Sequence, residues 1–112
     1  DRRGLCFLLG QLVSNSVKYT SDAPVLTFSL TCNTAETVLT VRDNGPGVRA
    51  CDLPYVFEKG FTGDSGHEKS KATGMGLYLA REIAKELGLM LSAASDWGAG
   101  FAVCISFPVV TQ

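Results

Sequence analysis

The chain has 112 residues, of which 46% are hydrophobic and 19% charged, and its net charge is -1. This length predicts one domain that buries about two-thirds of the surface of its unfolded chain. The charge balance gives no electrostatic support for nucleic acid binding, no apolar run reaches the length of a bilayer span, and no signal peptide opens the chain.

The first apolar period predicts a helix over residues 4–19, ended by the polar stretch that follows it. Its apolar face consists of Leu5, Leu8, Leu9 and Leu12. Gln11, Asn15 and Lys18 repeat at i, i+4 and i+7 and form a polar stripe along another face. By itself this stripe is typical of a solvated helix surface, although amide oxygens also suit a magnesium ion bound to a nucleotide.

Two alternating segments follow, VLTFSL (25–30) and TVLTVR (37–42), and a short polar link between them predicts a hairpin. Leu26, Phe28 and Leu30 share one side of the first segment. The stretch 43–74 then carries six glycines and two prolines, with a possible short helical turn in LPYVFEKGF. A segment of this length in a small domain is typical of a functional loop.

The rest of the chain returns to regular periods. Residues 76–88 predict a helix that Gly88 caps at its C-terminus, and residues 90–95 and 101–107 predict a final hairpin. The apolar face of this helix consists of Leu77, Ala80, Ile83, Ala84 and Leu87. The order of elements indicates an α+β fold, in which a layer of helices covers a largely antiparallel sheet.

The cysteines carry no metal-site pattern. Cys6, Cys32, Cys51 and Cys104 are scattered, and the chain has one histidine, so zinc spacing is absent. Cys6 and Cys104 lie in apolar runs where buried free thiols are common, which indicates a reducing, cytosolic compartment. The chain starts without Met and enters a helical pattern almost at once, so we expect it to be a piece of a longer protein.

Two glycine-rich segments could carry chemistry. In VRDNGPGV (41–48), Asp43 follows a strand and precedes Gly45 and Gly47, which a simple turn would also explain. In TGMGLYL (73–79), glycines precede a helix, whose N-terminus favours an anion. Neither the dinucleotide fingerprint nor the pattern GxxxxGK[ST] is present. Each segment alone is weak evidence.

Taken together, NSVKYT, DNGPG, FEKGFTG and GMGL resemble the N, G1, F and G2 boxes of the ATP-binding catalytic domain of bacterial sensor histidine kinases, in the gyrase, Hsp90, histidine kinase and MutL group. The resemblance covers roughly residues 5–107. It implies that residues 1–112 form one such domain, an α+β two-layer sandwich of helices on a mixed, largely antiparallel sheet. The strand that usually precedes the first helix is expected to be missing.

The resemblance also implies roles for individual residues. Asn15 would coordinate Mg2+, Lys18 would reach the phosphates, and Tyr19 would pack against the base. Asp43 would accept a hydrogen bond from the exocyclic amine of adenine, and Gly45 and Gly47 would let the backbone pass close to the base. Gln11, which stands where most such kinases have another asparagine, is a second candidate metal ligand.

The lid would be anchored by Phe57 and Phe61, although either could be a plain core residue. Nucleotide contacts are also implied for the segment in which the lid rejoins the helix: Thr73, Gly74, Met75, Gly76 and Leu77. The lid sequence is most similar to small-sensor kinases of the cell-envelope stress type. The sole histidine, His67, lies in this glycine-rich stretch and is not the expected phosphorylation target.

The implied function is transfer of the γ-phosphoryl group of Mg-ATP to a histidine on a separate dimerisation domain, and from there to a response regulator. The whole protein is expected to be a membrane-anchored homodimer with this domain in the cytoplasm. Two alternatives stay open: a serine kinase of the anti-sigma-factor type, and a non-catalytic adenine-nucleotide-binding module. Relatives that hydrolyse ATP carry a glutamate general base at the position of Gln11, so transfer is expected rather than hydrolysis.

Overall fold

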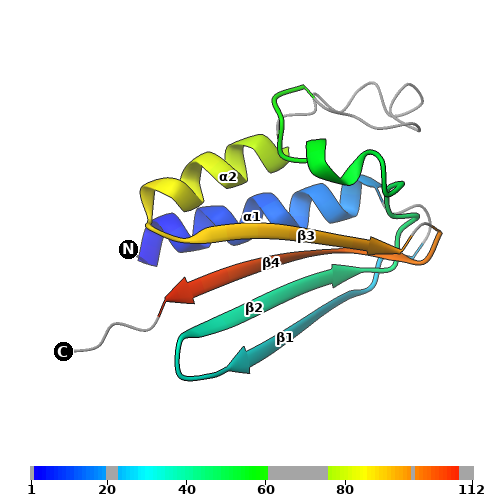
Figure 1. Ribbon diagram of the computed structural model, residues 1–112. Coiled ribbons are helices and arrows are strands. Elements are labelled where there is room, and N and C mark those ends of the chain that lie inside the picture. Colours follow the sequence, from blue (N-terminus) through cyan, green and yellow to red (C-terminus); the bar gives the residue numbers. More distant parts are fainter. Residues whose placement is uncertain (1, 20–22, 61–75, 97, 109–112) are drawn as a thin grey trace.

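A computed structural model describes residues 2–19, 23–60, 76–96 and 98–108, with the side chains of residues 18, 19 and 96 excepted. Two helices cover one face of a four-stranded sheet (Figure 1). In chain order the elements are α1 (Arg2–Tyr19), β1 (Leu26–Cys32), β2 (Glu36–Asp43), the 3-10 turn η1 (Leu53–Tyr55), α2 (Gly76–Glu86), β3 (Met90–Asp96) and β4 (Gly100–Pro108). The predicted α+β class is confirmed, and the predicted helical turn in LPYVFEKGF is η1.

The sheet has the order β1-β2-β4-β3, and within the described ranges every strand pairing is antiparallel. β4 therefore lies between β2 and β3, although the long loop and α2 separate β2 from β3 in the sequence. Val41 pairs with Val103, and Leu39 pairs with Ile105. Because directly paired residues share a face of the sheet, these side chains form the centre of the helix-covered face.

Helix α1 forms because its apolar side chains recur with the helical period and meet the sheet along one line. Leu8 and Leu12 are buried, and Leu5 and Leu9 pack against the same core. This is the face that the sequence predicts. Cys6, in contrast, is exposed, because it lies on the side of α1 that faces away from the sheet. The burial that its apolar run suggested is therefore wrong for this residue.

Helix α2 presents Ala80 and Ala84 to the core, and both are buried. Its end is a Schellman motif: Gly88 has a φ of 76°, the Leu89 amide donates to the Ala84 carbonyl at 2.8 Å, and the Gly88 amide donates to the Lys85 carbonyl at 3.1 Å. The predicted glycine cap is therefore confirmed. The motif also turns the chain directly into β3.

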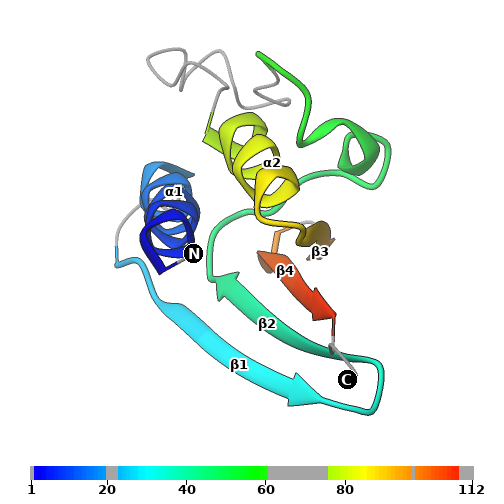
Figure 2. The same ribbon diagram turned by 90° about the vertical axis from the view of Figure 1, so that its left-hand side faces the viewer.

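Strand β1 has the predicted alternation but not the burial that alternation suggests. Phe28 is 51% exposed and Leu30 is 64% exposed, although both lie on the face that the helices cover elsewhere. β1 is the outermost strand, and the β1–β2 hairpin curves away from the helices (Figure 2). The alternation of apolar and polar residues predicts which face of the sheet a side chain lies on. Its burial depends on whether a helix covers that part of the sheet.

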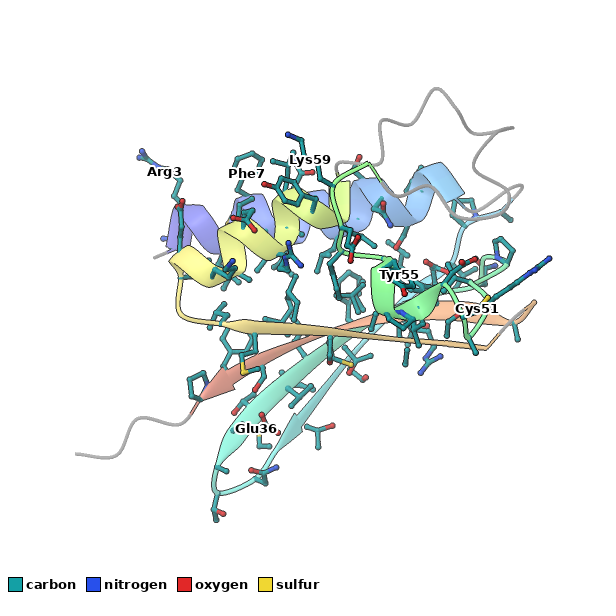
Figure 3. All side chains as sticks on the ribbon, turned by 45° about the horizontal axis from the view of Figure 1, so that its top comes forward. Arg3, Phe7, Glu36, Cys51, Tyr55 and Lys59 are labelled. Atoms are coloured by element: carbon teal, nitrogen blue, oxygen red, sulfur yellow. The ribbon has the colours of Figure 1, made fainter. Side chains whose placement is uncertain are left out.

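The fold brings several chain segments to one end of the molecule. The C-terminal end of α1, the end of β2, η1 and the beginning of α2 all lie there (Figure 1). Tyr55 and Cys51 mark this end in Figure 3, while Glu36 and Arg3 lie at the other. Of the helices within the described ranges, none has the length and hydropathy of a membrane span.

Candidate nucleotide-binding site

Asp43 is the last residue of β2 and lies on the helix-covered face, where it pairs with Leu26 on one side and Phe101 on the other. Its side chain is buried, with 7% of the residue exposed. One carboxylate oxygen, Oδ1, accepts a hydrogen bond from the Gly45 amide at 2.8 Å. Among the residues that the structure describes, no Lys or Arg forms an ion pair with this carboxylate.

A buried carboxylate without a cationic partner is costly unless hydrogen-bond donors satisfy it. The Gly45 amide supplies one donor and fixes the orientation of the group. The second oxygen, Oδ2, has no hydrogen bond from a described residue, so it can accept one from a ligand. Asp43 therefore has the properties of an oriented acceptor at the end of a strand.

The loop after Asp43 is tightly held. Asn44 accepts from the Val25 amide at 3.0 Å and donates to the Ala23 carbonyl at 3.1 Å, which ties the loop to the start of the β1 segment. Gly47 has a φ of 75°, a conformation that glycine adopts without the steric cost of a side chain. These glycines therefore form a turn, as their sequence suggests, and the same turn orients the Asp43 carboxylate for a possible ligand.

Asn15 lies in the last turns of α1 and meets the first residue of α2. A Cβ atom placed on Gly76 would stand 3.3 Å from Asn15 Oδ1, so the amide oxygen lies directly against the beginning of α2. Gln11 lies one helical turn earlier, and both residues are half-buried. The first turn of α2 carries no acidic residue. The backbone amides of a first helical turn have no partner within the helix, and they carry a partial positive charge.

The remaining predicted site residues are distributed as follows. Phe57 packs against the hydrophobic core, and this contact fits an anchor and a plain core residue equally. Leu77 also packs against the core. Lys18 and Tyr19 are the last residues of α1, at the same end as Asp43, but their side chains lie outside the described part. Phe61, Thr73, Gly74 and Met75 lie outside the described residues.

A ligand set for a metal ion is limited to amide oxygens. Where side chains are described, no three His, Cys, Asp or Glu residues gather as a group. Asn15 Oδ1 takes part in no side-chain hydrogen bond with a described residue, so it can bind a hard cation. An ion held by one such oxygen would complete its coordination with phosphate oxygens and water.

Sequence reasoning missed three contacts at this site. Ser95 and Gly98, from the β3–β4 hairpin, hydrogen-bond with the loop that follows Asp43, and Gly100 lies against the Asp43 carbonyl. The glycines of DWGAG were visible in the sequence as hairpin residues only. Nothing in the sequence pattern marks Ser95, because its partner is 47 residues away.

The chain is similar to known proteins over nearly its whole length. Residues 1–111 match the family described as histidine kinase-, DNA gyrase B-, and HSP90-like ATPase. The chain is 38% identical over 112 residues to the sensor protein BceS of Bacillus subtilis (strain 168), covering all of this chain and 33% of that protein. It is 42% identical over 108 residues to BceS of Halalkalibacterium halodurans, covering 96% of this chain and 32% of the relative. The chain thus spans about a third of the length of these relatives.

Solved structures show the same fold at lower sequence identity. The mycobacterial sensor histidine kinase MprB matches with a TM-score of 0.83 and 22% identity, over 96% of this chain and 74% of that chain. The catalytic domain of the histidine kinase ThkA matches with a TM-score of 0.75 and 21% identity, over 96% and 69% of the two chains. These matches support the two-layer arrangement of helices on a sheet.

Proposed function

The chain belongs to the histidine kinase-, DNA gyrase B- and HSP90-like ATPase family, as a catalytic domain of the sensor histidine kinase type, and from this premise we propose that it binds Mg-ATP and donates the γ-phosphoryl group to a protein histidine. The acceptor histidine would lie on a separate dimerisation domain of the same protein. The phosphoryl group would then pass to a response regulator.

The observation that carries the proposal is the oriented, buried carboxylate of Asp43. Adenine presents an exocyclic N–H2 donor where guanine presents a carbonyl acceptor. A carboxylate with one oxygen held by Gly45 and the other free can accept from the adenine amine, and it would repel the guanine oxygen. This chemistry supports adenine as the base.

The phosphate side of the site is supported by Asn15 and the beginning of α2. The Asn15 amide oxygen would hold Mg2+, which when bound supplies neutralisation of the developing phosphate charge. The backbone amides at the start of α2, next to Asn15, would orient the phosphates. Catalysis in this arrangement consists of positioning and electrostatic stabilisation, with no covalent intermediate on the chain.

The remaining proposals concern the whole protein. We propose a membrane-anchored homodimer of the cell-envelope stress type, in which this domain is cytoplasmic and acts on the dimerisation domain. The relative BceS is named as a sensor protein. His67 lies outside the described residues and, being in the lid sequence, is not proposed as the acceptor.

Calorimetric titration with Mg-ATP and Mg-GTP tests the base assignment. We expect saturable binding of Mg-ATP and at least tenfold weaker binding of Mg-GTP, because one lost hydrogen bond to a charged group is worth about a factor of ten or more. Equal affinities for the two nucleotides would contradict adenine recognition by Asp43.

Phosphotransfer is tested by adding a histidine-bearing dimerisation domain and labelled ATP. We expect an acid-labile phosphoprotein, since phosphohistidine hydrolyses in acid. An acid-stable product on a partner serine would support the serine kinase alternative instead. Binding without any transfer would support a non-catalytic module.

We expect negligible ATP hydrolysis by the chain alone. Gln11 stands one turn before Asn15, where hydrolysing relatives carry a glutamate, and a neutral amide cannot accept a proton from water at neutral pH. Phosphate release, followed colorimetrically with saturating Mg-ATP, is the measurement. Release at rates comparable to turnover by a typical ATPase would show that another group acts as the base.

A further inference from the structure

The loop that follows Asp43 is held in place by the β3–β4 hairpin. The Val48 amide donates to Ser95 Oγ at 2.7 Å, and Ser95 Oγ in turn donates to the Gly100 carbonyl at 3.1 Å. The Gly98 amide donates to the Pro46 carbonyl at 2.6 Å. Ser95 is thus a bridge between the loop and the first residue of β4.

The register of the sheet explains why this bridge bears on the site. Ser95 pairs with Phe101, and Phe101 pairs with Asp43 on its other side. The three side chains therefore stand in one row on the helix-covered face of three neighbouring strands. Ser95 is half-buried, at the end of the sheet where Asp43 lies.

The loop residues between Asp43 and Val48 have no regular secondary structure of their own. The Gly45 amide, which orients the Asp43 carboxylate, lies in this loop, three residues before Val48. A loop fixed at Val48 and Pro46 keeps the Gly45 amide in line with Asp43 Oδ1. Without the bond to Val48, the loop is held on this side by the Pro46 carbonyl alone.

We propose that Ser95 is a positioning residue of the nucleotide site, which acts through the loop by fixing the direction of the Asp43 carboxylate. This inference rests on the proposed function, because it assigns a role toward the base that Asp43 would bind. Ser95 itself touches neither the base nor the phosphates in this proposal.

Substitution of Ser95 by alanine removes both the acceptor for Val48 and the donor to Gly100. We expect ATP affinity to fall about threefold to tenfold, the range for the loss of one ordinary hydrogen bond. Ser95→Thr keeps the hydroxyl and suits a strand, so it should bind ATP within about twofold of the unsubstituted chain.

The matched control is Ser92→Ala. Ser92 lies on the same strand but on the opposite face, and it is exposed, so this change removes a hydroxyl without touching the loop. All variants are compared by calorimetry with Mg-ATP at a temperature where circular dichroism shows them fully folded. Amide hydrogen exchange, followed by NMR, reports Val48 and the sheet residue Val103 separately.

The expected result for Ser95→Ala is weaker ATP binding together with faster exchange at Val48 and unchanged exchange at Val103, while Ser92→Ala matches the unsubstituted chain. Faster exchange at Val48 with unchanged ATP affinity would overturn the positioning role, and so would equal losses in both alanine variants. If the unsubstituted chain fails to bind ATP, the proposed function falls and this role falls with it. In that case exchange at Val48 would still show whether the bridge exists.

Discussion

Replacing Asp43 with asparagine is expected to weaken ATP binding about tenfold or more and to leave the fold intact. Asparagine can keep its Oδ1 as the acceptor for the Gly45 amide, so the loop stays in place. The group that faces the base then becomes an N–H2 donor opposed to the donor of adenine. Hydrogen bonds to charged groups contribute about 1.5–3 kcal/mol, and each 1.4 kcal/mol is a factor of ten in affinity.

The same substitution should reduce the preference for ATP over GTP, because an amide N–H2 can donate to the guanine carbonyl. Calorimetry with both nucleotides measures this ratio. Glu36→Gln is the matched control, since it removes one negative charge at the opposite end of the sheet (Figure 3) and should bind both nucleotides like the unsubstituted chain. Unaltered ATP affinity in Asp43→Asn would remove Asp43 from the site.

The elements of the fold could be predicted because each carries its own periodic signal. Leu8 and Leu12 in α1, and Ala80 and Ala84 in α2, recur with the helical period, and all four are buried. The exposure of Phe28 could not be predicted in this way. It depends on the position of β1 at the edge of the sheet, and strand order is not encoded in the alternation of one strand.

The site was predictable to the extent that its residues lie close together in the sequence. Asp43, Gly45 and Gly47 form one segment, which the sequence marks as a candidate. The bond from the Gly45 amide to Asp43, which the sequence does not predict, spans only two residues. Ser95 and Gly100 meet the same loop from the other end of the chain, after the lid and α2. Such contacts follow from the pairing of β2 with β4, and this pairing could not be predicted from the sequence.

Gly100→Ala is expected to destabilise the fold by about 2–5 kcal/mol. Gly100 has a φ of 130°, and an added Cβ would stand 2.6 Å from the Asp43 carbonyl oxygen. Strained backbone conformations cost about 1–3 kcal/mol, and overpacking in a fixed environment costs a similar amount. The contact is with backbone in a paired strand, so neither partner can move without disturbing the β2–β4 ladder. Urea unfolding followed by circular dichroism measures the difference in the free energy of unfolding.

Gly98→Ala separates the two costs. Gly98 also has a positive φ, of 86°, but an added Cβ would meet nothing within 4 Å. Gly98→Ala should therefore lower the free energy of unfolding only by the cost of the strained backbone conformation, about 1–2 kcal/mol for a residue with a side chain. The excess loss in Gly100→Ala then measures the contact with Asp43. ATP affinity should fall further in Gly100→Ala than in Gly98→Ala, because the first change displaces Asp43, the residue proposed to bind the base, whereas Gly98 reaches the site only through its bond to Pro46 in the loop. Equal losses of ATP affinity in the two variants would mean that the close approach of β4 to Asp43 has no role in holding the carboxylate.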